Sequence, residues 1–584
     1  MPKIIRSTPA KAAYVLEKVQ EDRQKKLQAI RELGIDPYGG RYDTAEPIAE
    51  IVARYERWEA EQGGPEAAQE AEGGPRGDAA GRIVLMRKMG KLIFAHLRDQ
   101  TGQMQIALRK NAFDETTWAL GKELLDLGDL VAVEGPVRRT KTGEVTIWAE
   151  RLVLLCKSLN PMPEKFHGLT DTEARYRQRY LDLMTNPESM RRFRQRSEII
   201  AHFRRVLADR GFDEVETPAL QPIYGGGAAL PFTTHYNALD ADFYLRISPE
   251  LYLKRLLVGG MEKVYEFARV FRNEGIDSTH SPEYTLFELY QAGADYHVMM
   301  DITEELIATA AAIIRPADEV RQLLGQLMDW AALAKQYETM LRAAPQGFWD
   351  ATSLQLCRKP FEDIVSQTAG LDSAVRAALH AVQLRTQERL ALPYADQTID
   401  YTPPWPQEKY ADLLAKHADV DMRDAAAVRA KARELGIEES NKDDAVVVNE
   451  VFEETVEPAL AESDRPVFVM DYPAALCPLT RRKADDPEIA ERFELYIAGM
   501  EIANAYTELN DPAVQEANLR GQLRGEAEGE TMRVMDKDFI TALRHGMPPA
   551  GGLGIGIDRV VMLLTNTPSI RDAVLFPTLR PGDR

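Results

Sequence analysis

Residues 550–564 read AGGLGIGIDRVVMLL, a glycine-rich strand followed at once by a helix that begins near Arg559. Glycines at alternate positions let a ligand approach the backbone closely, although they also allow tight packing of a helix on a strand. A dinucleotide-binding fingerprint would need glycine at position 557, where this chain has isoleucine. The chain also has no G-x-x-x-x-G-K-[ST] loop. The stretch therefore predicts a ligand-binding strand outside these two nucleotide-binding classes.

A second stretch supplies a basic group for the same site. Residues 264–275 (VYEFARVFRNEG) and 285–292 (TLFELYQA) are typical of two antiparallel strands joined by a long polar loop, and Arg272 ends the first strand. A guanidinium holds a phosphate and a carboxylate together, because its planar fork makes two directed hydrogen bonds. Taken alone, a surface ion pair with a neighbouring glutamate is the simpler interpretation of Arg272.

The order of these stretches resembles a known family. An F-R-x-E stretch (271–274) followed much later by G-x-G-x-G-x-x-R resembles motifs 2 and 3 of the class II aminoacyl-tRNA synthetases. Segments 165–184 (KFHGLTDTEARYRQRYLDLM), 244–260 (YLRISPELYLKRLLVGG) and 504–512 (NAYTELNDP) look like the bacterial class II lysyl-tRNA synthetases. The resemblance covers about 10–310 and 396–582.

The resemblance implies an α+β multidomain fold. An N-terminal OB-fold β-barrel would precede a class II synthetase catalytic domain built on an antiparallel sheet flanked by helices. The domains expected are a helical extension and flexible linker at 1–80, the anticodon-binding barrel at 81–160, and the catalytic domain at 161–584. An Ala/Leu/Gln/Arg-rich helical insertion at about 316–395 lies between motifs 2 and 3, and the sequence assigns it no role.

The sequence pattern changes twice within the N-terminal third of the chain. Residues 10–33 are helix-like and end at Gly34, whereas 62–81 (QGGPEAAQEAEGGPRGDAAG) predict a linker or mobile loop. From residue 82, five short alternating runs separated by glycines indicate a small β-barrel. The resemblance assigns anticodon contacts to Arg87, Phe94, Gln105 and Glu144 of this barrel. For Phe94, periodicity alone favours a place in the core.

A long basic amphipathic helix is expected at about 187–210, ending at Gly211 and followed by the strand DEVETPAL and Pro218. This pattern resembles motif 1, which in the family builds the homodimer interface. Without the resemblance it is an ordinary helix packed on a sheet.

The substrate follows from strand periodicity. Glu288 and Tyr290 are two residues apart and share a strand face, as do Asn504, Tyr506 and Glu508. Placed side by side, the two strands would bring two carboxylates and two phenols to one pocket, with no basic residue on those faces. Such a pocket selects a cation that donates several hydrogen bonds, and the lysine ε-ammonium fits.

The resemblance distributes the substrate contacts. Lysine would be bound at its ε-ammonium by Glu288, Tyr290 and Glu508, at its carboxylate by Arg272 and Asn504, and at its α-ammonium by Glu250 with the backbone of Gly226. ATP would be bound by Arg272, Glu274, His280, Tyr284 stacked on adenine, and Arg559, with Arg272 and Arg559 as the catalytic pair. Glu250 also suits the first turn of a helix capped by Ser248, and core packing explains Tyr506 equally well when the family is set aside.

A magnesium site is expected beside the phosphates. Glu494 and Glu501 flank an apparent turn near Ala498-Gly499, so facing hairpin strands could place both carboxylates on Mg²⁺ bridging the ATP phosphates. Strict alternation puts Glu501 on the face opposite to Asn504. The assignment therefore requires a bulge, or a site that spans two faces.

Composition limits the partners. The 584-residue chain carries a formal charge of −20, yet residues 81–110 hold seven basic side chains against Asp99 alone. A basic module in an acidic body suits tRNA binding, although a solvated basic face is the simpler interpretation of that segment by itself. No signal sequence, membrane-length run or metal-ligand cysteine spacing is seen, and Cys156, Cys357 and Cys477 indicate reduced thiols in a cytoplasmic protein. The expected partners are tRNA(Lys), ATP, L-lysine and a second copy of the chain, without a membrane.

Other interpretations stay open. An aspartate- or asparagine-specific synthetase would share the fold without lining its pocket with glutamates. An enzyme that lysylates a protein would normally lack the anticodon domain. A non-catalytic tRNA-binding relative would be expected to lose Arg272, Glu274 or Arg559, all of which are present. One departure from the family is that 225–232 reads GGGAALPF, so that Leu230 stands where members usually have arginine.

Overall fold

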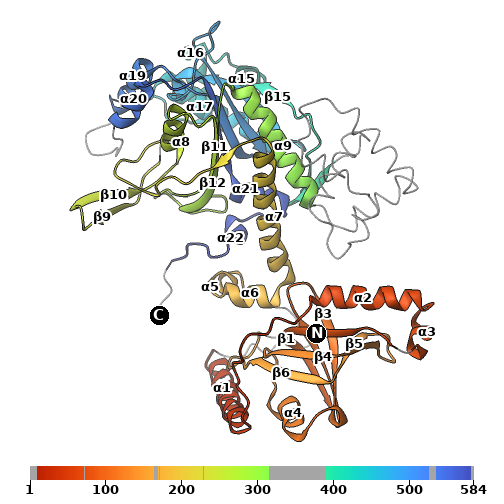
Figure 1. The fold of residues 1–584 in the computed structure, drawn as a ribbon. Coiled ribbons are helices and arrows are strands. Elements are labelled where there is room, and N and C mark those ends of the chain that lie inside the picture. The colour runs from red at the N-terminus through yellow and green to blue at the C-terminus, as the bar shows by residue number, and fades with distance from the viewer. Residues whose placement is uncertain are drawn as a thin grey trace. The chain divides into compact units, whose positions relative to one another are not determined.

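The computed structural model describes residues 9–71, 73–163, 169, 171–227, 229–314, 390–524 and 535–580. The chain divides between Thr170 and Asp171 into two compact units (Figure 1).

The first unit contains a closed β-barrel. Within its described residues the strands are β1 (Arg76–Met89), β2 (Leu92–Arg98), β3 (Gln103–Arg109), β4 (Leu130–Arg139), β5 (Val145–Ala149) and β6 (Arg151–Cys156). Strand pairing runs β1-β2-β3-β5-β4 and returns from β4 to β1, while β6 pairs with β4 outside this ring. The barrel predicted from the alternating runs is confirmed, except that its last run forms two strands, β5 and β6.

Helices accompany the barrel, and one of them corrects the sequence prediction. They are α1 (Pro9–Glu32), α2 (Ile48–Glu61), α3 (Pro65–Glu70) and α4 (Glu115–Ala119). The helix expected at 10–33 is confirmed by α1. The expectation that 62–81 is only a linker is wrong, because α3 and the start of β1 lie within it. Pro65 at the first helical position starts α3.

The small residues of this segment serve close packing of strands. A Cβ on Gly81 would lie 2.8 Å from the carbonyl oxygen of Arg98 on the neighbouring strand, and Ala79 is fully buried. The glycine and alanine content that resembles a flexible linker is therefore what lets β1 approach β2 closely.

The second unit is built on a large, mostly antiparallel sheet. Its described residues form eight paired strands in the order β15-β16-β17-β18-β19-β12-β11-β7. Their bounds are β7 (Asp213–Glu214), β11 (Lys263–Phe271), β12 (Glu283–Ala292), β15 (Gln407–Lys409), β16 (Val467–Pro473), β17 (Ile489–Ile497), β18 (Met500–Thr507) and β19 (Ala550–Gly556). Only the outermost pairs, β7–β11 and β15–β16, are parallel.

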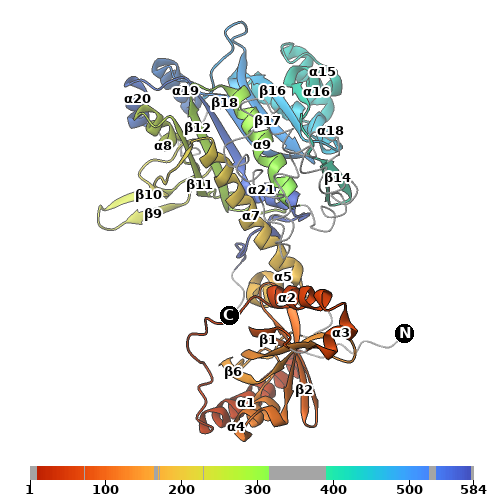
Figure 2. The ribbon, with the colours of Figure 1, turned by 45° about the vertical axis from the view of Figure 1, so that its right-hand side comes forward.

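One face of this sheet carries the hydrophobic core. Helices α7 (Pro187–Asp209) and α9 (Tyr296–Ile314) lie across it, as Figure 2 shows. The central strands bury alternate apolar residues toward these helices, namely Phe287, Leu289, Phe493, Leu495, Ala503, Ala505, Leu553 and Ile555. Because side chains alternate along a strand, the residues between them point to the opposite face. That opposite face carries the site.

Helix α8 (Glu250–Val258) and helix α20 (Lys537–Arg544) pack together beside β11 and β12. The helix predicted at 187–210 is confirmed by α7. The strand predicted from DEVETPAL is much shorter than expected, since only Asp213–Glu214 pairs with β11. A small sheet of β8 (Leu220–Gln221), β10 (Ala241–Leu245) and β9 (Thr233–Tyr236) follows.

The other described elements of this unit are α5 (Thr172–Arg177), α6 (Arg179–Thr185), β13 (Ala391–Tyr394), β14 (Gln397–Asp400), α15 (Tyr410–Ala418), α16 (Ala425–Leu435), α17 (Asp444–Thr455), α18 (Glu457–Ala461), α19 (Pro512–Arg524), α21 (Ile557–Leu564) and α22 (Ile570–Ala573). Residues 315–389, which hold nearly all of the predicted helical insertion, lie outside the described residues. No helix in the described ranges is long and apolar enough to span a membrane.

Candidate active site

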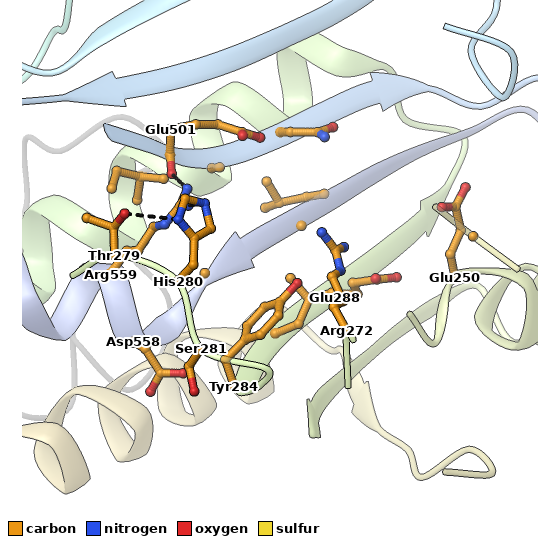
Figure 3. Close-up of a pocket in the computed structure, with 18 of the residues that line it drawn as sticks. Glu250, Arg272, Thr279, His280, Ser281, Tyr284, Glu288, Glu501, Asp558 and Arg559 are labelled. Atoms are coloured by element: carbon orange, nitrogen blue, oxygen red, sulfur yellow. Dashed lines mark hydrogen bonds between the residues drawn. The ribbon is translucent and has the colours of Figure 1, made fainter. Parts of the chain in front are cut away.

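A cavity of about 330 Å³ lies on the sheet face opposite to α9. The predicted site residues that line it are Gly226, Glu250, Arg272, Glu274, His280, Tyr284, Glu288, Tyr290, Glu501, Asn504, Tyr506 and Arg559. Figure 3 shows that Arg559, His280 and Glu501 gather at one end of the cavity, Glu250 lies at the other, and Arg272 lies between. Segments far apart in sequence thus meet in one site.

The glycine-rich strand forms the floor of this cavity. Strands β12 and β18 were expected side by side, but β19 lies between them and pairs with both. Gly554 is in register with Glu288 and Asn504, and Gly552 is in register with Tyr290 and Tyr506. The expectation of adjacency is wrong. The shared face is nevertheless real, because glycines separate the two rows of side chains without filling the space.

The Glu508 carboxylate lies in the space left by Gly552, which lines the cavity, although Glu508 itself is not among the lining residues. A Cβ on Gly552 would lie 1.9 Å from Glu508 Oε1 and 2.6 Å from the ring of Tyr290. The Glu508 carboxylate is buried; its Oε2 lies 2.6 Å from the ammonium of Lys254, whereas its Oε1 accepts no hydrogen bond from the described residues. A buried carboxylate oxygen without a donor is costly unless a ligand supplies one.

Two further carboxylates complete the acidic end. Glu288 accepts hydrogen bonds from Ser248 Oγ at 2.7 Å and Tyr290 OH at 3.1 Å. Glu250 Oε1 accepts one from Tyr506 OH at 2.8 Å. The backbone N–H of Glu250 also donates to Ser248 Oγ at 3.0 Å, so both interpretations of Glu250, helix start and pocket carboxylate, hold together.

Sequence reasoning missed a cation at this end. Lys254, one helical turn after Glu250 on α8, lies 2.5 Å from Glu250 Oε1 and 2.6 Å from Glu508 Oε2, and it is fully buried. The strand faces carry no basic residue, as expected, but the helix supplies one. The i,i+4 spacing of Glu250 and Lys254 was the available signal. Three carboxylates face one lysine, so the acidic end keeps a negative excess.

Burial and mutual repulsion change the acidity of this end. Burial raises the pKa of Glu288 to about 8, with Glu250 adding to the effect. Burial also raises the pKa of Glu508 to about 8, while Lys254 opposes the rise. Burial disfavours the charge of Lys254, but Glu250 and Glu508 outweigh it and raise its pKa. The site favours an additional positive charge beside Glu288 and Glu508.

Arg272 is poised for an anionic ligand. Across the described ranges no carboxylate pairs with it, and its buried Nε has no hydrogen-bond partner. Its guanidinium carbon lies 5.5 Å from the ring centroid of Tyr284, and a Cβ on Gly227 would lie 3.9 Å from its Nη2. The alternative of a surface ion pair is therefore wrong. A buried, unpaired donor beside a cavity indicates a site for phosphate or carboxylate oxygens.

Arg559 is held at the opposite end. Its Nη1 donates to the backbone carbonyl of Glu501 at 2.6 Å, and its Nη2 lies 3.0 Å from His280 Nε2. His280 Nδ1 in turn lies 2.7 Å from Asp277 Oδ2. These contacts orient the guanidinium toward the cavity, as Figure 3 shows.

A β-bulge resolves the geometry of Glu494 and Glu501. The hairpin turn predicted near Ala498 and Gly499 is confirmed, and both residues have positive φ. The register of β17 and β18 shifts between Leu495 and Tyr496. One extra residue in β18 resets the alternation, so that Glu501 and Asn504 both line the cavity.

The two carboxylates differ in their surroundings. Glu494 Oε2 accepts from Tyr472 OH at 2.8 Å and Tyr496 OH at 2.9 Å, and Arg492 also contacts Glu494. Burial and the neighbouring Glu494 raise the pKa of Glu501 to about 7. No group of three or more potential metal-ligating side chains occurs in the part of the chain that is described. Glu494 does not line the cavity, so a cation here would take its ligands from Glu501 and the substrate, with Glu494 adding negative charge behind them, which suits Mg²⁺.

The barrel carries the predicted anticodon residues on one outer face. Phe94 is in register with Arg87, and it lies on the outer face of β2, whereas Ile93 and Ala95 are in the core. The expectation that Phe94 is core is therefore wrong. Glu144 accepts a hydrogen bond from Gln105 at 2.6 Å.

The same barrel face holds groups that the sequence did not single out. Trp148 meets Phe94 edge-on at 6.1 Å, and Arg109 lies 3.9 Å from the Trp148 ring centroid. His96 Nε2 lies 2.6 Å from Glu144. Alternation along EVTIWAER was the signal that would have placed Trp148 on this face. Leu230, by contrast, does not line the active-site cavity, and its side chain is 48% exposed.

Comparison with known proteins gives the same division of the chain. Residues 171–580 match the family model described as "tRNA synthetases class II (D, K and N)", and residues 79–155 match an OB-fold nucleic acid binding domain. A lysine–tRNA ligase of Moorella thermoacetica is 42% identical over 566 residues, covering 96% of this chain and 97% of that protein. Lysine–tRNA ligases of Pelotomaculum thermopropionicum (43% identical, 97% and 96% covered) and Staphylococcus aureus strain MRSA252 (41%, 96% and 97%) are also similar.

Proposed function

This chain belongs to the lysine–tRNA ligases, a family of class II aminoacyl-tRNA synthetases, and from that premise we propose how its residues divide the reaction. The overall reaction joins lysine to tRNA at the expense of ATP. The observation that carries the assignment of the site is the buried acidic end of the cavity beside the unpaired Arg272.

Lysine binds with its side chain in the acidic end. Glu288, Tyr290 and Glu508 hold the ε-ammonium, and the absence of a donor to Glu508 Oε1 among the described residues supports this role. Glu250, with the backbone of Gly226, holds the α-ammonium. Tyr506 packs beside Glu250 and completes the wall. An aspartate-specific site would need a free cation here, and Lys254 is already paired with two carboxylates.

ATP binds along the rest of the cavity. Tyr284 stacks on adenine, while Arg559 holds adenine and the γ-phosphate, and Glu274 and His280 add contacts. Glu501, with Glu494 behind it, holds Mg²⁺, which when bound offsets the negative charge of the phosphates. The raised pKa of Glu501 supports this role, because a carboxyl repelled by its neighbour gains from a nearby cation.

The chemistry is positioning and charge stabilisation. Arg272 holds the lysine carboxylate, together with Asn504, and also contacts the α-phosphate, so that the carboxylate attacks phosphorus in line. This step forms lysyl-adenylate and releases pyrophosphate. The terminal ribose hydroxyl of tRNA(Lys) then attacks the mixed anhydride, which releases AMP.

The barrel selects the tRNA at the anticodon through Arg87, Phe94, Gln105 and Glu144. Stacking of bases on aromatic side chains and polar contacts to base edges suit the mixed character of this face. The chain has domain limits at 1–80, 81–160 and 161–584. It forms a homodimer through the α7 region and is located in the cytoplasm.

The test is amino-acid-dependent ATP–pyrophosphate exchange on the purified protein, without tRNA and with each of the twenty amino acids in turn. Exchange with lysine alone is expected. Exchange with aspartate or asparagine would contradict the roles of Glu288 and Glu508, and absence of exchange with any amino acid would contradict catalysis.

A further inference from the structure

Lys254 is a fully buried ammonium that the proposed reaction does not use. Removing an ammonium from water is costly unless it is paired, and its partners are the pocket residues Glu250 at 2.5 Å and Glu508 at 2.6 Å. It does not line the cavity among the described residues. Its partner Glu250, in contrast, does line the cavity and links Lys254 to the ligand site.

Within the described residues, the ionisable groups that act on Lys254 belong to the wall of the amino-acid pocket. These groups are Glu250 on α8, Glu288 and Tyr290 on β12, Tyr506 on β18, and Glu508 just after β18. The Lys254 ammonium lies 5.5 Å from the Tyr506 ring centroid and 6.0 Å from that of Tyr290. The ammonium thus sits behind the wall that receives the substrate side chain.

A count of charges explains the arrangement. Glu250, Glu288 and Glu508 supply three negative charges when ionised, and Lys254 supplies one positive charge. Two negative charges remain, and lysine brings two ammonium groups to this end of the cavity, at its α and ε positions. In a poorly solvated site an unmatched charge is expensive, so a substrate with one ammonium group would leave the pocket unbalanced.

We propose that Lys254 is a positioning residue that sets the charge of the amino-acid pocket, so that the two ammonium groups of lysine complete it. The inference rests on the proposed function of the pocket. Lys254 fixes Glu250 and Glu508 by charge and opposes the rise that burial causes in the pKa of Glu508. Without Lys254, the pKa of Glu508 would rise further, and lysine would have to displace a more strongly held proton in order to bind.

The experiment compares Lys254→Met with Lys254→Arg, which keeps the charge. A matched control is Lys157→Met, since Lys157 is also fully buried and pairs with Asp126 at 2.6 Å and Asp129 at 2.8 Å in the other unit. Lysine-dependent ATP–pyrophosphate exchange is measured across pH, with the KM values of lysine and ATP and the thermal unfolding midpoint of each full-length protein.

For Lys254→Met we expect the acid limb in the pH profile of lysine kcat/KM to move to higher pH by about one unit or more. Near neutral pH this shift corresponds to a loss of about tenfold in kcat/KM for lysine. The loss should shrink as pH rises, and the KM of ATP should change little. Lys157→Met should lower the unfolding midpoint without moving the limb. Lys254→Arg should leave the pH position of this acid limb unchanged, whatever its effect on the KM of lysine.

A loss in Lys254→Met that is equal at every pH and for both substrates would reduce Lys254 to a structural ion pair and overturn the inference. If Lys254→Met does not fold, the pH profile of Lys254→Arg becomes the test. A displaced acid limb in that profile would overturn the inference. Absence of lysine-dependent exchange in the wild-type protein would instead overturn the proposed function, and the inference with it.

Discussion

The Glu508 carboxylate fills the space that a side chain at Gly552 would need: a Cβ on Gly552 would lie 1.9 Å from Glu508 Oε1. The glycine is therefore required by the carboxylate next to it, which extends across the floor strand toward the acidic end. Gly554, in the same strand, has no neighbour closer than 3.8 Å to its added Cβ. The two glycines accordingly have different roles, and substitution separates them.

Gly552→Ala is expected to displace Glu508 and Tyr290 and to lower kcat/KM for lysine by at least about tenfold, with a loss of unfolding free energy of about 1–3 kcal/mol. Gly554→Ala should keep the stability, and any loss of activity in it reports a ligand lying against the strand. Pyrophosphate exchange and thermal unfolding measure both variants. Normal lysine kinetics in Gly552→Ala would show that Glu508 is dispensable or that the strand moves freely.

Glu508→Gln should strongly reduce the rate of lysine activation, because the ε-ammonium of lysine loses a buried charge partner. We expect kcat/KM for lysine to fall at least about thirtyfold, equivalent to ~2 kcal/mol or more, with little change in the KM of ATP. Glu516→Gln on helix α19, which pairs with Arg520 and Arg544 outside the site, is the control. Near-normal lysine kinetics in Glu508→Gln would refute the pocket assignment.

Lysine binding should release protons near neutral pH. The pKa values of Glu288 and Glu508, both raised to about 8, place protons on the free pocket that the substrate ammonium displaces. Lysine affinity should therefore rise with pH up to about 8 and then level off. Calorimetry at pH 7 in two buffers of different ionisation enthalpy counts the protons. Identical binding enthalpies in both buffers would contradict the prediction.

The same carboxyls make the stability of the unliganded protein depend on pH. Because their pKa values in the folded state lie above the ordinary value of 4.5, the folded protein binds more protons than the unfolded chain between that value and about 8. Their contribution to stability should fall as pH rises through this window, and saturating lysine should reverse the fall. Unfolding midpoints across pH, with and without lysine, measure it.

Phe94→Ala should weaken charging of tRNA and leave lysyl-adenylate formation almost intact. A lost stacking contact is worth about 1–3 kcal/mol per base. Ile93→Ala, one residue away on the core side of the same strand, is expected to destabilise the barrel by about 2–5 kcal/mol instead. Equal losses of pyrophosphate exchange and tRNA charging in Phe94→Ala would argue against an anticodon role.

Glu501→Gln should raise the Mg²⁺ concentration needed for half-maximal pyrophosphate exchange, because one carboxylate ligand is lost. The same change should stabilise the metal-free protein above about pH 7, since it removes a carboxyl whose pKa burial and Glu494 raise to about 7. Glu491→Gln on strand β17 serves as the control. An unchanged Mg²⁺ dependence in Glu501→Gln would contradict a role for the Glu501 carboxylate in metal binding.

The periodicity of the sequence correctly predicted which side chains share a face wherever that face belongs to a single strand. Glu288 with Tyr290, and Asn504 with Tyr506, do share the cavity side, because side chains alternate along any strand regardless of its neighbours. The helix at 187–210, the turn at Ala498 and Gly499 and the barrel runs depend on equally local signals. Local rules were misleading where composition was ambiguous, as in 62–81, whose small residues permit close strand packing as well as flexibility.

The sequence by itself determined the class of site: which residue types carry charge, which share a strand face, and which family motifs they form. Only the tertiary structure decided which strands are neighbours, that a bulge brings Glu501 to the side of Asn504, and that Lys254 joins the acidic end from a helix. Strand order and helix placement depend on contacts between residues distant in sequence. Their free energies come from burial and charge pairing in the assembled core, which no local pattern encodes.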